Sequence, residues 1–207
     1  MTWYANYIIV EPTPAAISEF RLVPGIKNHL FLVDNIDGYD FYKEEHRHSM
    51  PSDGLLIIRE VCDIEQRREW DKTVSVSWDI FKEIKDVEII DRGEFESFYQ
   101  GWEDSIPPIA LLKFLKWVNV TTHSVVSYYY CSTWAGTVEE EFSWVYDKEE
   151  TIYTLHDDNS TVIYQTEPST ISNKTILQLT LSHYNLYLPT NVFALCDREF
   201  NWEKYRI

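Results

Sequence analysis

The residues best placed by type and spacing to do chemistry lie at 44–48, where the sequence reads EEHRH. Imidazole and carboxylate groups are ligands that zinc and other transition metals accept. A closed site needs further ligands, and no second cluster in the sequence supplies them. We therefore predict no metal and no other cofactor, and we name His46 and His48 as the candidate ligands should a metal bind.

The cysteines do not form a recognisable reactive or metal-binding set. Cys62, Cys131 and Cys196 are widely spaced and include no CxxC pair, so they predict neither a disulfide framework nor a zinc site. Cys62 and Cys131 fall in apolar or Tyr-rich stretches that are typical of buried strands. The sequence also lacks GxSxG, GxGxxG and GxxxxGK[ST], and so it names no reaction.

Acidic and aromatic residues alternate in a second candidate region, at 134–158. Between 137 and 158 there are eight acidic residues and one lysine. Acidic side chains steer a basic protein toward a surface, and aromatic side chains hold it once water is excluded. The candidate partner-binding residues are Trp134, Glu139, Glu140, Glu141, Trp144, Glu149 and Glu150. The alternative is a sheet whose aromatic residues face the core and whose acids face water.

The whole chain is strongly acidic, with 34 Asp and Glu against 18 Lys and Arg, or a net charge of −16. Nucleic acids and anionic lipids are bound chiefly through Lys and Arg, so we expect neither as a ligand. No apolar run approaches the ~20 residues that cross a bilayer, and the first residues lack the basic start of a signal peptide. We expect a cytoplasmic protein, although such a charge also simply favours solubility.

The pattern of apolar residues predicts strands mixed with helices. Strands are expected at 3–11, 30–33, 55–62, 73–78 and 87–90, and helices at 14–22, 93–106, 109–118 and 175–186. Between them, residues 34–53 read as one irregular loop. A connection of that length is either functional or mobile.

Residues 124–165 predict a four-stranded antiparallel meander with turns near 135–136, 147–150 and 157–159. In its second strand Phe142, Trp144 and Tyr146 alternate with Glu141 on the opposite face. These elements together predict one α+β domain over residues 1–207, with helices packed on an antiparallel sheet.

Two stretches carry a resemblance to a group of known proteins. They are SVVSYYYCSTWAGTVEEEFSWVYDKE at 124–149 and ISNKTILQLTLSHYNLYLPTNVFALCDREFNWEKY at 171–205. Over about 80 residues they resemble small bacterial cytoplasmic proteins, some of which are immunity proteins beside toxin genes. The group shows an aromatic strand, a Gly-Gly turn, an acidic-then-aromatic strand, a closing helix and a tail ending in Trp. Here Ala135-Gly136 stands in place of Gly-Gly, and Trp144 and Trp202 match the later aromatics.

The resemblance implies a protein without catalytic activity. Together with the acidic meander, it leads to the interpretation that the chain is an acidic protein-binding domain, with an immunity-type inhibitor of a basic toxin as the narrower hypothesis. One alternative is an enzyme of unknown chemistry that uses the 34–53 loop with His46 and His48. Another is a structural or oligomer-forming protein.

Overall fold

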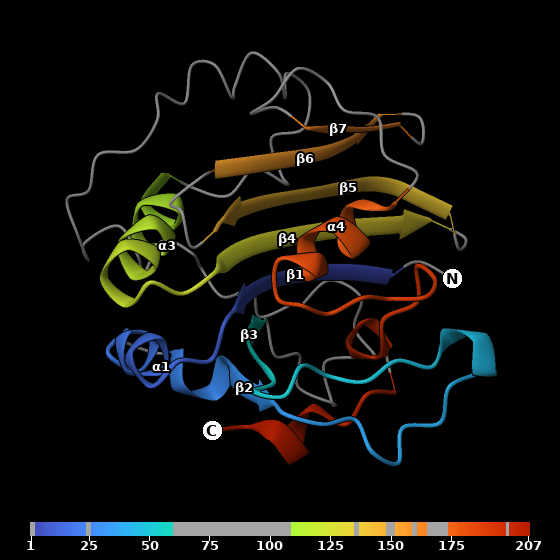
Figure 1. Ribbon diagram of the computed structural model, residues 1–207, viewed down its shortest axis with the longest axis horizontal. Coiled ribbons are helices and arrows are strands. Elements are labelled where there is room, and N and C mark those ends of the chain that lie inside the picture. Colours follow the sequence, from blue (N-terminus) through green and yellow to red (C-terminus); the bar gives the residue numbers. More distant parts are fainter. Residues whose placement is uncertain are drawn as a thin grey trace, which may run out of the picture.

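The described part of the chain is built on one antiparallel sheet. The computed structural model describes residues 3–23, 26–59, 109–134, 137–147, 152–158, 161–164, 174–197 and 199–207. Within these ranges, seven strands pair in the order β2-β3-β1-β4-β5-β6-β7 (Figure 1). They are β1 (Trp3–Val10), β2 (Leu30–Val33), β3 (Leu55–Arg59), β4 (Val126–Trp134), β5 (Thr137–Tyr146), β6 (Ile152–Asp158) and β7 (Thr161–Tyr164).

The predicted α+β fold with a C-terminal meander is confirmed, because β4 to β7 follow one another along the sheet and every pair is antiparallel. The meander differs from its prediction at one turn. Asp157 and Asp158 continue β6, and Asp158 pairs with Thr161 of β7. Pairing with the neighbouring strand therefore outweighs the turn preference of Asp. The elements predicted at 73–78, 87–90 and 93–106 lie outside the described residues.

Three α-helices accompany the sheet in the described residues, and threonine side chains cap the N-termini of two of them. In α1 (Pro14–Arg21), the Thr13 hydroxyl accepts a hydrogen bond from the backbone N–H of Ala16. In α4 (Ile176–Ser182), Thr175 and Gln178 form a capping box, in which each side chain satisfies an otherwise unpaired backbone N–H. This helix ends four residues before the predicted Leu186.

The remaining helix, α3 (Ile109–Thr122), runs four residues beyond its predicted end at Val118. The hydroxyls of Thr121 and Thr122 donate to the carbonyls of Trp117 and Val118, at 2.7 and 2.6 Å. The next residue, His123, has a positive φ of 52°. A left-handed residue of this kind cannot continue an α-helix, so the chain turns there toward β4.

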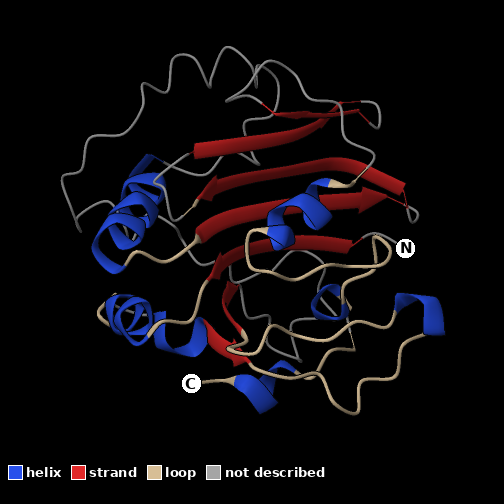
Figure 2. Cartoon of the chain, in the orientation of Figure 1, coloured by secondary structure: helices blue, strands red, loops and turns tan. Residues whose placement is uncertain are grey.

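Apolar residues cover both faces of strands β1 to β5. One cluster joins Ile8, Tyr128 and Trp144 to residues of α1 and α3. The other joins Ile9, Tyr129 and Val145 to α4 and to residues 184–205. We call these the α1/α3 face and the α4 face; α4 lies across β4 and β5 (Figure 2). Because both faces are buried, a side chain that alternates away from one apolar layer enters another instead of water.

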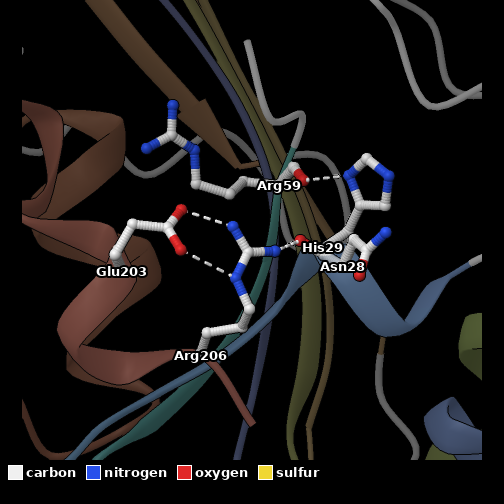
Figure 3. A network of polar contacts seen from close by, with 5 residues as sticks. All are labelled: Asn28, His29, Arg59, Glu203 and Arg206. Carbon is white, nitrogen blue, oxygen red and sulfur yellow. Dashed lines mark hydrogen bonds and ion pairs between the residues drawn. The ribbon is translucent and has the colours of Figure 1, made fainter. Parts of the chain in front are cut away.

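The C-terminal residues dock against the edge strand β2. The backbone N–H of Ile207 donates to the Leu30 carbonyl at 3.2 Å, and Arg206 forms a β-bridge with Phe31. The guanidinium of Arg206 also pairs with Glu203 and donates to the Asn28 carbonyl (Figure 3). A free strand edge is a site for unwanted pairing, and this tail covers part of it.

Candidate functional site

The predicted partner-binding residues are not all on the surface. Glu141 and Trp144 are only 4% and 5% exposed, and they point to opposite faces of β5. Trp144 packs in the apolar cluster with residues of α1 and α3, whereas Glu141 lies on the opposite face of β5. For Trp134, Glu139 and Glu140 only the backbone is described, in β4 and β5. The remaining two candidates, Glu149 and Glu150, lie outside the described residues.

Glu141 connects the sheet to α4. Its Oε1 accepts hydrogen bonds from the Tyr129 hydroxyl and from the backbone N–H of Leu177, both at 2.9 Å. Leu177 is the second residue of α4, where backbone N–H groups have no partner within the helix. A carboxylate at this end also interacts favourably with the helix dipole. Alternation in β5 therefore directs Glu141 away from the α1/α3 face and beneath α4, not into solvent.

A cavity of about 310 Å³ opens beside Glu141. Its walls come from four parts of the chain. Strands β4 and β5 contribute Tyr129 and Glu141, the start of α4 contributes Leu177, the 191–197 segment contributes Asp197, and the 34–53 loop contributes Tyr39. The volume is at the lower end of the range for small-molecule pockets. We call this space the α4 cavity.

The α4 cavity is acidic. Its described lining residues include Glu141 and Asp197 and no Lys, Arg or His. The Tyr39 hydroxyl donates a short hydrogen bond to Asp197. Burial raises the pKa of Tyr39, and the hydrogen bond and negative charge of Asp197 raise it further. The phenol therefore stays protonated at neutral pH and keeps donating to the carboxylate.

Cys131 and Cys196, neither of which forms a disulfide, also line the α4 cavity. Burial raises the pKa of Cys196 well above its usual value, and Cys131, Glu141 and Asp197 raise it further, while Arg59 opposes them. A thiol is nucleophilic as the thiolate. The cavity therefore holds Cys196 in its unreactive form, and its net field disfavours added negative charge.

The histidines of the 34–53 loop serve its packing. The His46 Nδ1 lies 3.0 Å from the Thr190 hydroxyl, and the His48 Nδ1 lies 2.9 Å from the His46 carbonyl. The His48 ring packs against Phe41 and Phe193, with ring centroids 4.9 and 5.7 Å away. Within the part of the chain that the structure describes, no three His, Cys, Asp or Glu side chains form a group able to hold a metal.

Comparison with known proteins gives no relative: no family model, no curated protein and no solved structure matches the chain. Across the described ranges, no helix is long and apolar enough to cross a membrane.

Sequence reasoning missed the residues that form the α4 cavity. Tyr39 and Asp197, which are hydrogen-bonded, are 158 positions apart, and neither belongs to a motif. Cys196 was noted only as one of three scattered thiols. The one local signal was Glu141, an acid in a strand that also carries Phe142, Trp144 and Tyr146. When both faces of a strand are covered, an acidic side chain in that strand needs a buried hydrogen-bond donor.

Proposed function

We propose that this chain is a non-catalytic binding domain for a basic protein, and more narrowly an immunity-type inhibitor of a basic toxin in the bacterial cytoplasm. The observation that carries the proposal is the α4 cavity, whose described walls hold two carboxylates and no basic side chain. A concave acidic site on a chain of charge −16 favours a cationic ligand. The resemblance of residues 124–149 and 171–205 to immunity-type proteins supports the narrower form.

The 34–53 loop adds charge of the same sign next to the cavity. It contains six acids and two bases. Both bases are paired within the loop: Lys43 lies 3.3 Å from Glu45, and Arg47 lies 2.8 Å from Glu44. The four remaining acids, all exposed, are Asp34, Asp37, Asp40 and Asp53. Acids arranged in this way accelerate encounter with a basic surface.

A protein interface also needs side chains that contribute binding energy, and exposed aromatic residues can supply it. Tyr42 in the loop is 91% exposed, and Tyr187 after α4 is 67% exposed. Tyrosines are among the residues that contribute most binding energy once a partner desolvates them. We assign both to the partner-binding surface, together with Glu139, Glu140, Glu149 and Glu150 of the meander.

Affinity capture from the native host, followed by association kinetics at two salt concentrations, tests the proposal. Two fourfold variants remove charge at constant size. One changes Glu139, Glu140, Glu149 and Glu150 to Gln; the other changes Asp34, Asp37, Asp40 and Asp53 to Asn. With a basic partner, we expect at least one variant to slow association about tenfold at low salt, with a smaller effect on dissociation.

A matched control changes charge on the other face of the sheet. Lys113→Gln with Lys116→Gln on α3 alters net charge by two units far from the α4 cavity, and association should stay within about twofold of wild type. The proposal fails if the captured partner is acidic. It also fails if association with a basic partner is independent of salt and unchanged in both fourfold variants.

A further inference from the structure

We propose that the α4 cavity is a socket for an arginine side chain of the partner. This inference rests on the proposed function and assigns the chemical group that the partner inserts. The cavity of about 310 Å³ has room for one side chain but not for a folded element. Its acidic groups approach from two directions, Glu141 from β5 and Asp197 from the segment after α4.

Hydrogen bonds from the protein itself already hold the two carboxylates of the walls in place. Tyr129 and the N–H of Leu177 fix one oxygen of Glu141. Tyr39 and the backbone N–H of Glu199 fix the carboxylate of Asp197, the latter at 2.9 Å. Preorganised carboxylates bind a cation without the entropic cost of ordering flexible side chains.

The remaining walls favour guanidinium over ammonium. Aromatic rings of Tyr39, Tyr129 and Phe193 line the cavity beside the two carboxylates. A guanidinium is planar, stacks on aromatic rings, is weakly hydrated and binds a carboxylate with two parallel hydrogen bonds. An ammonium is strongly hydrated and must lose more of its water in a partly apolar site.

The chain holds its own arginines in the same manner outside the cavity. The guanidinium carbon of Arg59 lies 4.4 Å from the Trp202 ring centroid. That of Arg206 lies 5.1 Å from the Phe31 ring centroid, while its nitrogens pair with Glu203 (Figure 3). Aromatic ring plus carboxylate is thus an arrangement that binds guanidinium within this molecule, and the α4 cavity offers it with no described arginine in its lining.

The test is an NMR titration of the full chain with three probes of similar length: the N-acetyl methylamides of arginine, lysine and norleucine. We expect saturable shifts at the backbone amides of Val138, Leu177 and Val192, which line the cavity. The arginine probe should bind in the millimolar range and at least threefold more tightly than the lysine probe. The norleucine probe should produce no saturable shift.

Variants separate the socket from general electrostatic attraction. Asp197→Asn keeps an acceptor for Tyr39 and should weaken arginine binding about tenfold. Glu199→Gln removes the same charge two residues away, from an exposed side chain that is absent from the described lining, and should leave it unchanged. Because Asp197 is exposed, the Asp197→Asn variant should fold like the wild type.

Several results would overturn the socket. They are equal binding of the arginine and lysine probes, shifts spread over the surface without saturation, and equal losses in Asp197→Asn and Glu199→Gln. The proposed function fails differently. If a basic protein binds with salt-dependent association and Asp197→Asn has no effect on its affinity, the function stands and the socket is wrong. If the arginine probe fills the cavity but no basic protein binds, the socket stands and the function is wrong.

Discussion

Glu141→Ala removes the acceptor that two buried donors share. The Tyr129 hydroxyl and the Leu177 N–H each donate to Oε1 at 2.9 Å. A buried donor left without a partner costs about 1–3 kcal/mol, which gives about 2–6 kcal/mol for the pair. Because Glu141 lines the α4 cavity, water can reach one of the donors. We therefore expect the lower half of that range, about 2–4 kcal/mol.

Chemical denaturation and thermal unfolding of the variant measure this loss. For a chain of about this size, 1 kcal/mol corresponds to roughly 2–4 °C in Tm, so Glu141→Ala should lower Tm by about 4–16 °C. Glu141→Gln is the matched control, since it keeps a carbonyl oxygen for both donors and loses only the charge. We expect it to cost about 1 kcal/mol.

A double-mutant cycle with Tyr129→Phe isolates one of the two bonds. Tyr129→Phe removes the hydroxyl and leaves Leu177 as a donor to Glu141. The coupling free energy between Tyr129→Phe and Glu141→Ala should be about 1–2 kcal/mol, as for residues in direct hydrogen-bonded contact. A loss of less than about 0.5 kcal/mol in Glu141→Ala, with no coupling to Tyr129, would refute a structural role for this carboxylate.

Two further predictions concern the 34–53 loop and its junction with β3. Gly38 and Gly54 both have positive φ, at 84° and 77°. Their surroundings differ: a Cβ added at Gly54 would lie 2.6 Å from the Val33 carbonyl oxygen, whereas a Cβ added at Gly38 would meet no atom within 4 Å. Gly38→Ala should therefore cost about 1 kcal/mol of unfolding free energy and Gly54→Ala about 1–3 kcal/mol more; equal costs in urea unfolding would contradict the clash. Burial lowers the pKa of His48 from its usual 6.5, so the unfolded chain takes up a proton first and stability should fall as pH drops through about 6.5. His48→Phe should reduce that fall; unfolding curves of the variant and the wild type at pH 7.5 and 5.5 measure it.

Local signals predicted the elements well where a cap or a continuous apolar run marks them. Pro14 begins α1 as predicted, and α4 begins at Ile176, one residue after the predicted start at Thr175, which caps the helix. The ends were less predictable, because α3 continues through Thr122 with the help of its own threonine hydroxyls. Such bonds follow from the helix having formed and leave no distinctive pattern in the sequence.

The candidate site could not be predicted in the same way. Alternation in β5 correctly separates Trp144 from Glu141, but it does not tell whether the second face meets water or another layer. That depends on α4, whose Leu177 contacts Glu141 across 36 positions of sequence. The α4 cavity likewise needs Tyr39 and Asp197 in contact, and no local rule relates residues so far apart.

Residues that contact each other across long stretches of sequence also determine when the fold can be completed during synthesis. The Tyr7 hydroxyl donates to the Leu195 carbonyl, 188 positions later, and Arg206 donates to Asn28 across 178 positions. Strand β1, which lies between β3 and β4 in the sheet, therefore leaves the ribosome long before its α4-face partners exist. Folds of high contact order form slowly and expose apolar strands while they wait. We expect the nascent chain to depend on chaperones, and refolding from denaturant to be slower than in helical proteins of equal length.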